Sequence, residues 1–164
     1  MSGTARTQRG VSIVEALVAL VVLSVGMLGI AGMFLESVRS NRTALVRTTA
    51  IQLVNDMADR VRSNRSGRTD YNLATSDTPT AGKDCSALEC TPTQLAKYDL
   101  AQWYTAVLAT LPEGADGAKP MTSIVFTPGT SLIDPGSYTI TASWKEPGDD
   151  SYLSTTVEVR QIGG

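Results

Sequence analysis

The apolar run from Val11 to Leu35 constrains this chain more than any other feature of its sequence. The run carries one carboxylate, Glu15, and directly follows the basic segment MSGTARTQRG. About twenty apolar residues are enough for a helix to cross a bilayer, and Arg6 and Arg9 before the run favour a cytoplasmic N-terminus. A charge this close to the edge of a membrane span is costly, so we expect Glu15 to have an assigned partner.

The junction between leader and apolar run resembles the class III leader of type IV pilins and pseudopilins. Its parts are Gly10, Val11 and, four residues later, Glu15. The resemblance implies that a prepilin peptidase cuts after Gly10 and leaves the apolar segment on the mature chain. The new α-amino group of Val11 can then pair with Glu15 of its own or a neighbouring subunit. Pairing the two charges lowers the desolvation cost that each would meet alone.

Two other kinds of N-terminus fit less well. A secretory signal has a shorter apolar core followed by an A-x-A-like cleavage site, whereas the far end here reads GIAGMFLE. A plain signal anchor suits the length of the run but gives no reason for Glu15.

Composition argues against most catalytic and nucleic-acid functions. The 164 residues include 14 Lys and Arg, 16 Asp and Glu, and no His. Without His there is no Ser-His-Asp or Cys-His centre, and the commonest zinc ligand is missing. A mildly acidic chain is a poor general binder of nucleic acid. The acidic pairs Asp56 with Asp59 and Asp149 with Asp150 are typical of solvated surface, so we expect no enzymatic activity and no cofactor.

Cys85 and Cys90 enclose the short loop CSALEC. In an oxidising periplasm, an even number of cysteines predicts a disulfide. The alternatives are a redox pair or half of a metal site. Redox motifs usually place the thiols closer, and four-ligand metal sites need more Cys or His, so a structural disulfide is favoured.

A helical pattern continues past the apolar run, and no proline interrupts residues 11–65. One continuous helix of that span would be about 80 Å long. Residues 11–35 are apolar on all sides and suit lipid or a filament core, and 64–67 are expected to end the helix. Residues 36–65 are amphipathic, with an apolar stripe that should pack on a globular head: Val46, Ala50, Leu53, Val54, Met57 and Val61.

Gly26, Gly29 and Gly32 lie inside the membrane half and each weakens the helix by up to about 1 kcal/mol relative to Ala. Close helix packing through small residues is one interpretation. Melting of the segment as the subunit enters a filament is the other, and the sequence leaves both open.

The rest of the chain predicts a small α+β head. Residues 66–92 are polar and irregular, and 93–111 form a second helix with a broad apolar face. Three strands follow, at 121–127, 137–145 and 152–162, with a turn at 147–150. The long helix then lays its stripe on a small antiparallel sheet, with the disulfide loop and second helix between them in sequence.

The cysteine loop, TPTQLAKYDLAQW and LATLPEGADG together resemble the PilV-type minor pilins, or type IV pilus modification proteins. One departure is Val11, where most pilins have Phe. The resemblance implies a type IV pilin fold with four parts: a cleaved leader, 1–10; a transmembrane and assembly segment, 11–35; the amphipathic half of the helix, 36–65; and a periplasmic head, 66–164. It assigns Val11 to N-methylation and Glu15 to subunit register.

The same resemblance implies a minor pilin that primes pilus assembly near the tip. Its partners would be the prepilin peptidase, other minor pilins, the major pilin, the inner-membrane assembly platform and a tip adhesin. It would lie in the inner membrane with a periplasmic head, and later on the cell surface. The alternatives are a minor pseudopilin of a type II secretion system, a membrane-tethered enzyme, and a DNA-uptake pilin that uses the basic cluster Arg60, Arg62, Arg65 and Arg68.

Overall fold

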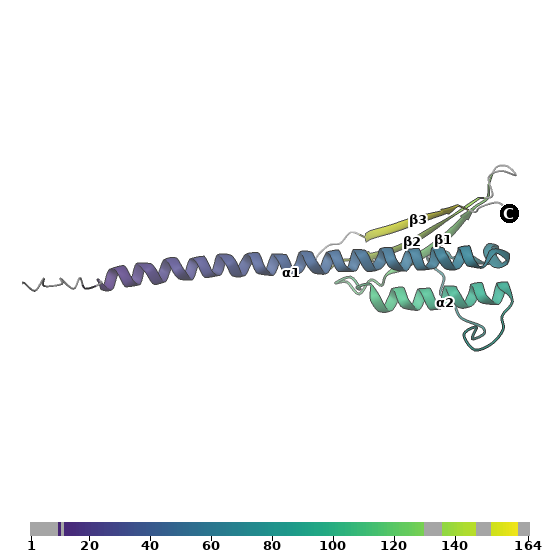
Figure 1. The fold of residues 1–164 in the computed structure, drawn as a ribbon, viewed down its shortest axis with the longest axis horizontal. Helices are drawn as coiled ribbons and strands as arrows, with labels where there is room; N and C mark the ends of the chain where they lie inside the picture. The colour runs from purple at the N-terminus through teal and green to yellow at the C-terminus, as the bar shows by residue number, and fades with distance from the viewer. Residues whose placement is uncertain (1–9, 11, 130–135, 147–151, 161–164) are drawn as a thin grey trace, which may run out of the picture. The chain divides into compact units, whose positions relative to one another are not determined.

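The structure is a computed structural model that describes residues 10, 12–129, 136–146 and 152–160. It confirms the predicted α+β fold of a long helix, a second helix and an antiparallel sheet (Figure 1). The chain divides into two compact units, residues 1–42 and 43–164. In order, the elements are α1 (Ile13–Ser63), the 3₁₀ helix η1 (Arg65–Tyr71), α2 (Pro92–Thr110), β1 (Met121–Thr127), β2 (Ser137–Lys145) and β3 (Tyr152–Arg160).

Helix α1 ends at Ser63, two residues before the predicted end at residue 65. Asn64 leaves the helical conformation, with φ −97° and ψ 65°, and its side chain accepts a hydrogen bond from the Gly67 N–H. This cap starts η1 inside the region that the sequence predicts to be irregular. Arg60 and Arg62 lie in the last turn of α1, where cations favour the negative end of the helix dipole.

The predicted apolar stripe of α1 is confirmed. Its buried members are joined by Ala58, which the pattern did not include, while Val46 and Leu53 are partly buried against the same core. The fully buried set on α1 is Ala50, Val54, Met57, Ala58 and Val61.

Helix α2 begins at Pro92, one residue before the predicted start. Thr91 and Gln94 form a capping box, in which each side chain accepts a hydrogen bond from the other residue's backbone N–H. Leu111 is extended, as expected before a proline, so the helix ends at Thr110 and not at Leu111. The indole Nε1 of Trp103 donates to the carbonyl oxygen of Leu53 at 2.8 Å, which ties α2 to α1.

The sheet has the order β1-β2-β3 with antiparallel pairs throughout. Strands β1 and β2 have the predicted bounds. The prediction extended β3 to residue 162, and both its last two positions and the predicted turn at 147–150 lie outside the described residues. Alternate side chains of β1 and β2 are buried, in agreement with the period of two: Thr122, Ile124, Tyr138, Ile140, Ala142 and Trp144.

The core of the second unit lies where both helices and the sheet meet. Figure 1 shows α2 along one side of the C-terminal part of α1, and the three strands along another. Among the described residues, the largest fully buried side chains come from α1, η1, α2, β1 and β2, and they include Met57, Tyr71, Trp103, Ile124 and Trp144.

Candidate functional site

The predicted assembly segment lies at the start of α1. Gly10 is exposed, and an added Cβ there would have nothing within 4 Å. Val11 lies outside the described residues. The Ala16 N–H donates to the Ser12 carbonyl at 3.1 Å, so the helix is closed from its first turn. Glu15 lies in that turn, where the helix dipole favours a carboxylate.

Glu15 is exposed, and within the described part of the chain its carboxylate has no hydrogen-bond or ion-pair partner. Every described residue from Ser12 to Arg42 is likewise exposed. Large apolar side chains such as Ile13, Met33 and Phe34 are therefore left without cover in the single chain. By length and composition, α1 is apolar enough to cross a membrane.

The three glycines of this segment pack against no other part of the described chain. A Cβ added at Gly26, Gly29 or Gly32 would meet nothing within 4 Å. Any reason for glycine at these positions therefore lies in contacts outside the single chain or in the flexibility of the helix.

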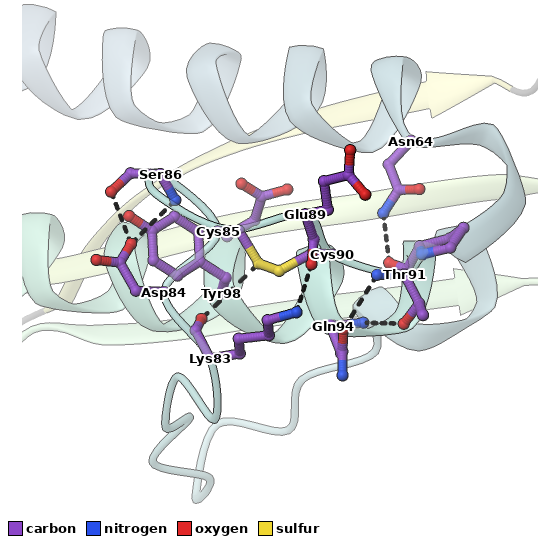
Figure 2. The surroundings of a disulfide bond; sticks show 12 residues. Asn64, Lys83, Asp84, Cys85, Ser86, Glu89, Cys90, Thr91, Gln94 and Tyr98 are labelled. Carbon is purple, nitrogen blue, oxygen red and sulfur yellow. Dashed lines mark hydrogen bonds between the residues drawn. A yellow bond between two sulfur atoms is a disulfide. The ribbon is translucent and has the colours of Figure 1, made fainter.

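The cysteine loop of the head is closed by a disulfide (Figure 2). The Cys85 and Cys90 sulfurs are 2.07 Å apart, so neither thiol is free for redox or metal chemistry. The Lys83 ammonium donates to the Glu89 carbonyl, and Ser86 donates twice to Asp84.

The disulfide and the hydrogen bonds of Lys83 and Ser86 restrict the conformation of the cysteine loop. The apolar side chain of Leu88 in this loop is 57% exposed. Hydrogen bonds from the hydroxyl and then the backbone N–H of Ser86 lower the pKa of Asp84 below its usual value.

A buried polar network joins α1, η1 and α2, and the sequence interpretation missed it. Its centre is Asp99, whose side chain is 8% exposed. The Arg60 guanidinium donates to Asp99 Oδ1 at 3.0 Å, and the Tyr71 hydroxyl donates to Oδ2 at 2.6 Å. Asn64 Nδ2 donates to the Tyr71 oxygen at 3.1 Å and to the Pro92 carbonyl at 2.8 Å. Asp99 interrupts the apolar face of α2, and that interruption was the available signal.

The network also shifts the pKa of its members. Burial, together with the hydrogen bond to Asp99, raises the pKa of Tyr71 well above its usual value of 10.0. Burial alone would lower the pKa of Arg60, but the hydrogen bonds to Asp56 and Asp99 outweigh it and raise this pKa.

Two of the four arginines in the suspected DNA-binding cluster pair with carboxylates of α1 and α2. Arg60 pairs with Asp56 and Asp99, and Arg62 pairs with Asp59 at 2.7 Å. These pairs also neutralise the acidic pair of α1, while Asp149 and Asp150 lie outside the described residues. No group of three or more potential metal ligands occurs in the described ranges.

Two family matches adjoin each other along the chain. Residues 5–31 match the prokaryotic N-terminal methylation motif, and residues 32–101 match the Tt1218-like family, described as type IV pilin Tt1218. No curated protein and no solved structure matches the chain.

The two matches bear on different parts of the molecule. The methylation motif covers residues 5–10 of the leader, the predicted cleavage site and Glu15. The pilin match covers the rest of α1, η1, the disulfide loop and the first half of α2. Together with the long apolar helix and the antiparallel sheet, they make the chain similar to type IV pilins, at the level of a pilin or pseudopilin.

Proposed function

We propose that this chain is a minor pilin that primes type IV pilus assembly. The observation that carries the proposal is Glu15, a carboxylate without a partner in the described chain. It lies in the first part of α1, which up to Leu35 is otherwise uncharged and exposed. A lone charge in such a helix is costly unless a second molecule supplies the opposite charge. A function in which subunits leave the membrane and pack together provides that second molecule.

Three residues of the N-terminal segment, Gly10, Val11 and Glu15, have assigned roles in this proposal. Prepilin peptidase cuts between Gly10 and Val11, and the new terminus at Val11 is N-methylated. The amine of one subunit pairs with Glu15 of its neighbour, which fixes the register between them. The exposed apolar side chains of α1 then exchange lipid for neighbouring helices, so that little apolar area meets water during assembly.

The assignment to minor pilins rests on the head. The loop closed by Cys85 and Cys90, the Asp99–Trp103 motif of α2 and the turn after it resemble PilV-type proteins. We propose that the head lies in the periplasm and contacts other minor pilins, the major pilin and a tip adhesin. The assembly platform of the inner membrane would extract the subunit, which then reaches the cell surface at the pilus tip.

The test is substitution of the carboxylate at normal protein level. Glu15→Leu makes the helix more apolar, so membrane insertion and cleavage should persist. Co-purification with other minor pilins and surface piliation should both fall, by about tenfold if the ion pair contributes roughly 1.4 kcal/mol. Glu15→Gln should be intermediate because it keeps hydrogen bonding without the charge.

The matched control is Glu36→Gln, which removes the next carboxylate of the same helix and should leave assembly near wild-type. Wild-type piliation and co-purification with Glu15→Leu would reject the role of Glu15.

A minor pseudopilin of a type II secretion system is the second candidate, because the methylation motif and the pilin match suit both machines. Deletion strains separate them. Loss of surface pili with normal protein secretion supports the pilus, whereas loss of secretion with normal piliation supports the pseudopilus.

A further inference from the structure

Two arginines follow the apolar part of α1 and have no partner in the described chain. Arg39 and Arg42 are exposed, and neither makes a hydrogen bond or ion pair with any described residue. They are three residues apart, so they occupy neighbouring positions on one side of the helix. Glu36, one turn earlier, makes no ion pair with either of them in the described chain. Arg47 differs, because its Nε pairs with Glu146 at 3.3 Å.

The charge along this stretch has one sign. From Ser37 to Asn55, α1 contains Arg39, Arg42 and Arg47 and no Asp or Glu. Because Glu146 neutralises Arg47, the uncompensated positive charge is confined to Arg39 and Arg42. Removal of the leader would also remove Arg6 and Arg9, which leaves this pair as the basic side chains next to the apolar segment.

The spacing places the pair at the depth of lipid headgroups if the apolar segment spans the membrane. A helix rises 1.5 Å per residue, so Arg39 lies about 6 Å beyond Leu35 and Arg42 about 10 Å beyond it. The headgroup layer of a bilayer extends roughly 5 to 8 Å beyond the hydrocarbon. Long arginine side chains can reach back toward this layer while their stems cover apolar surface.

We propose that Arg39 and Arg42 bind the phosphates of anionic phospholipids in the leaflet where α1 leaves the membrane. A guanidinium holds a phosphate through two parallel hydrogen bonds, and the pair presents two such groups within one turn. Bound lipid would fix the depth of the subunit and hold it in the membrane until assembly displaces the lipid. This inference rests on the membrane anchoring in the proposed function, but it does not depend on which machine the pilin serves.

The experiment measures lipid selectivity of the mature full-length protein in phosphatidylcholine vesicles that contain 30% phosphatidylglycerol. Spin-labelled lipids report how strongly each headgroup associates with the protein. The wild type should prefer phosphatidylglycerol, and Arg39→Gln/Arg42→Gln should reduce that preference by about fivefold for each arginine. Arg65→Gln, which removes an exposed arginine of η1, is the matched control and should change nothing. High salt should weaken the wild-type preference because headgroup electrostatics are screened.

Equal phosphatidylglycerol preference in the wild type and the double variant would overturn the proposal. So would a double variant that keeps lipid selectivity but loses co-purification with other pilins, because the arginines would then serve a neighbouring subunit. Flotation with vesicles tests the anchor separately. If the wild-type protein does not float, the placement of the arginines at the headgroups is wrong. If the wild-type protein floats but shows no preference for phosphatidylglycerol, only the proposed role of the arginines is wrong.

Discussion

At the scale of single residues, the head depends on a carboxylate that lies among apolar side chains. Asp99 accepts hydrogen bonds from Arg60 and Tyr71, so its buried charge is compensated from two sides. The three residues come from α2, α1 and η1, and the network therefore fixes how these elements meet. A buried charge of this kind is costly when one partner is removed, because the other is left uncompensated.

Asp99→Asn should lower the free energy of unfolding by about 2 kcal/mol, because it weakens hydrogen bonds to charged partners inside the head. Urea unfolding of the full-length protein in detergent measures this through Trp103 and Trp144, which are both buried. The control is Asp59→Asn. Asp59 also pairs with an arginine, but its side chain is 76% exposed, so its loss should change little. Equal effects from the two variants would contradict a structural role for the network.

Because the pKa of Tyr71 is raised in the folded protein, part of the free energy of unfolding depends on pH in the alkaline range. The unfolded tyrosine ionises near pH 10, whereas the folded one resists ionisation, so its contribution is complete below pH 10 and is lost as pH rises above it. In Tyr71→Phe this decline is absent. The difference in unfolding free energy between wild type and Tyr71→Phe should therefore shrink between pH 9 and pH 11. A constant difference across that range would show that Tyr71 ionises normally in the fold.

At the scale of elements, the close approach of η1 to α2 requires a glycine. A Cβ added at Gly67 would lie 2.4 Å from the Pro92 carbonyl oxygen and 2.6 Å from Asn64 Nδ2. Both neighbours belong to the junction of α1, η1 and α2. Because the nearest atom is backbone, a side chain here forces the two elements apart.

Gly67→Ala should destabilise the head by about 1 to 3 kcal/mol, the usual cost of overpacking. The same urea unfolding assay applies. Gly82→Ala is the matched control, since a Cβ there has nothing within 4 Å and the φ angle is not in the left-handed region. If Gly82→Ala were as destabilising as Gly67→Ala, the cause would be a general effect of losing glycine and not the contact with Pro92.

At the scale of the whole molecule, the two units differ in whether they bury their own apolar side chains. Residues 43–164 bury their own core, whereas the described residues up to Arg42 leave their apolar side chains exposed. The first unit therefore needs lipid or other subunits to cover it, and in the proposed function cleavage after Gly10 precedes the exchange of one for the other.

Gly10→Val should block processing, because the resemblance implies a small residue beside the scissile bond. Full-length precursor should accumulate in the membrane, and few pili should form. Mass spectrometry of the N-terminus gives the readout, with a wild-type chain that begins at Val11. The control is Gly82→Ala, which should be processed normally. A wild-type chain that begins at Met1 or beyond Leu35 would contradict the class III leader.

Local pattern was enough to predict most elements of this protein. The period of three to four residues located α1 and its stripe, the period of two gave β1 and β2 their bounds, and the helix predicted at 93–111 placed the start of α2 within one residue. These features depend on neighbours in sequence, so they can be inferred without the fold. The candidate segment around Gly10 and Glu15 was recognised for the same reason, because its signal is contiguous.

Only the tertiary structure decided which polar residues support the head. Asp99 and Arg60 are 39 residues apart in the chain, and Arg47 and Glu146 are 99 apart, yet each pair forms an ion pair. Arg60 belongs to the basic cluster at the end of α1, yet its guanidinium pairs with a carboxylate of α2. Whether a polar side chain is solvated or paired depends on which distant groups the fold brings within hydrogen-bond distance, and local periodicity contains no information about that.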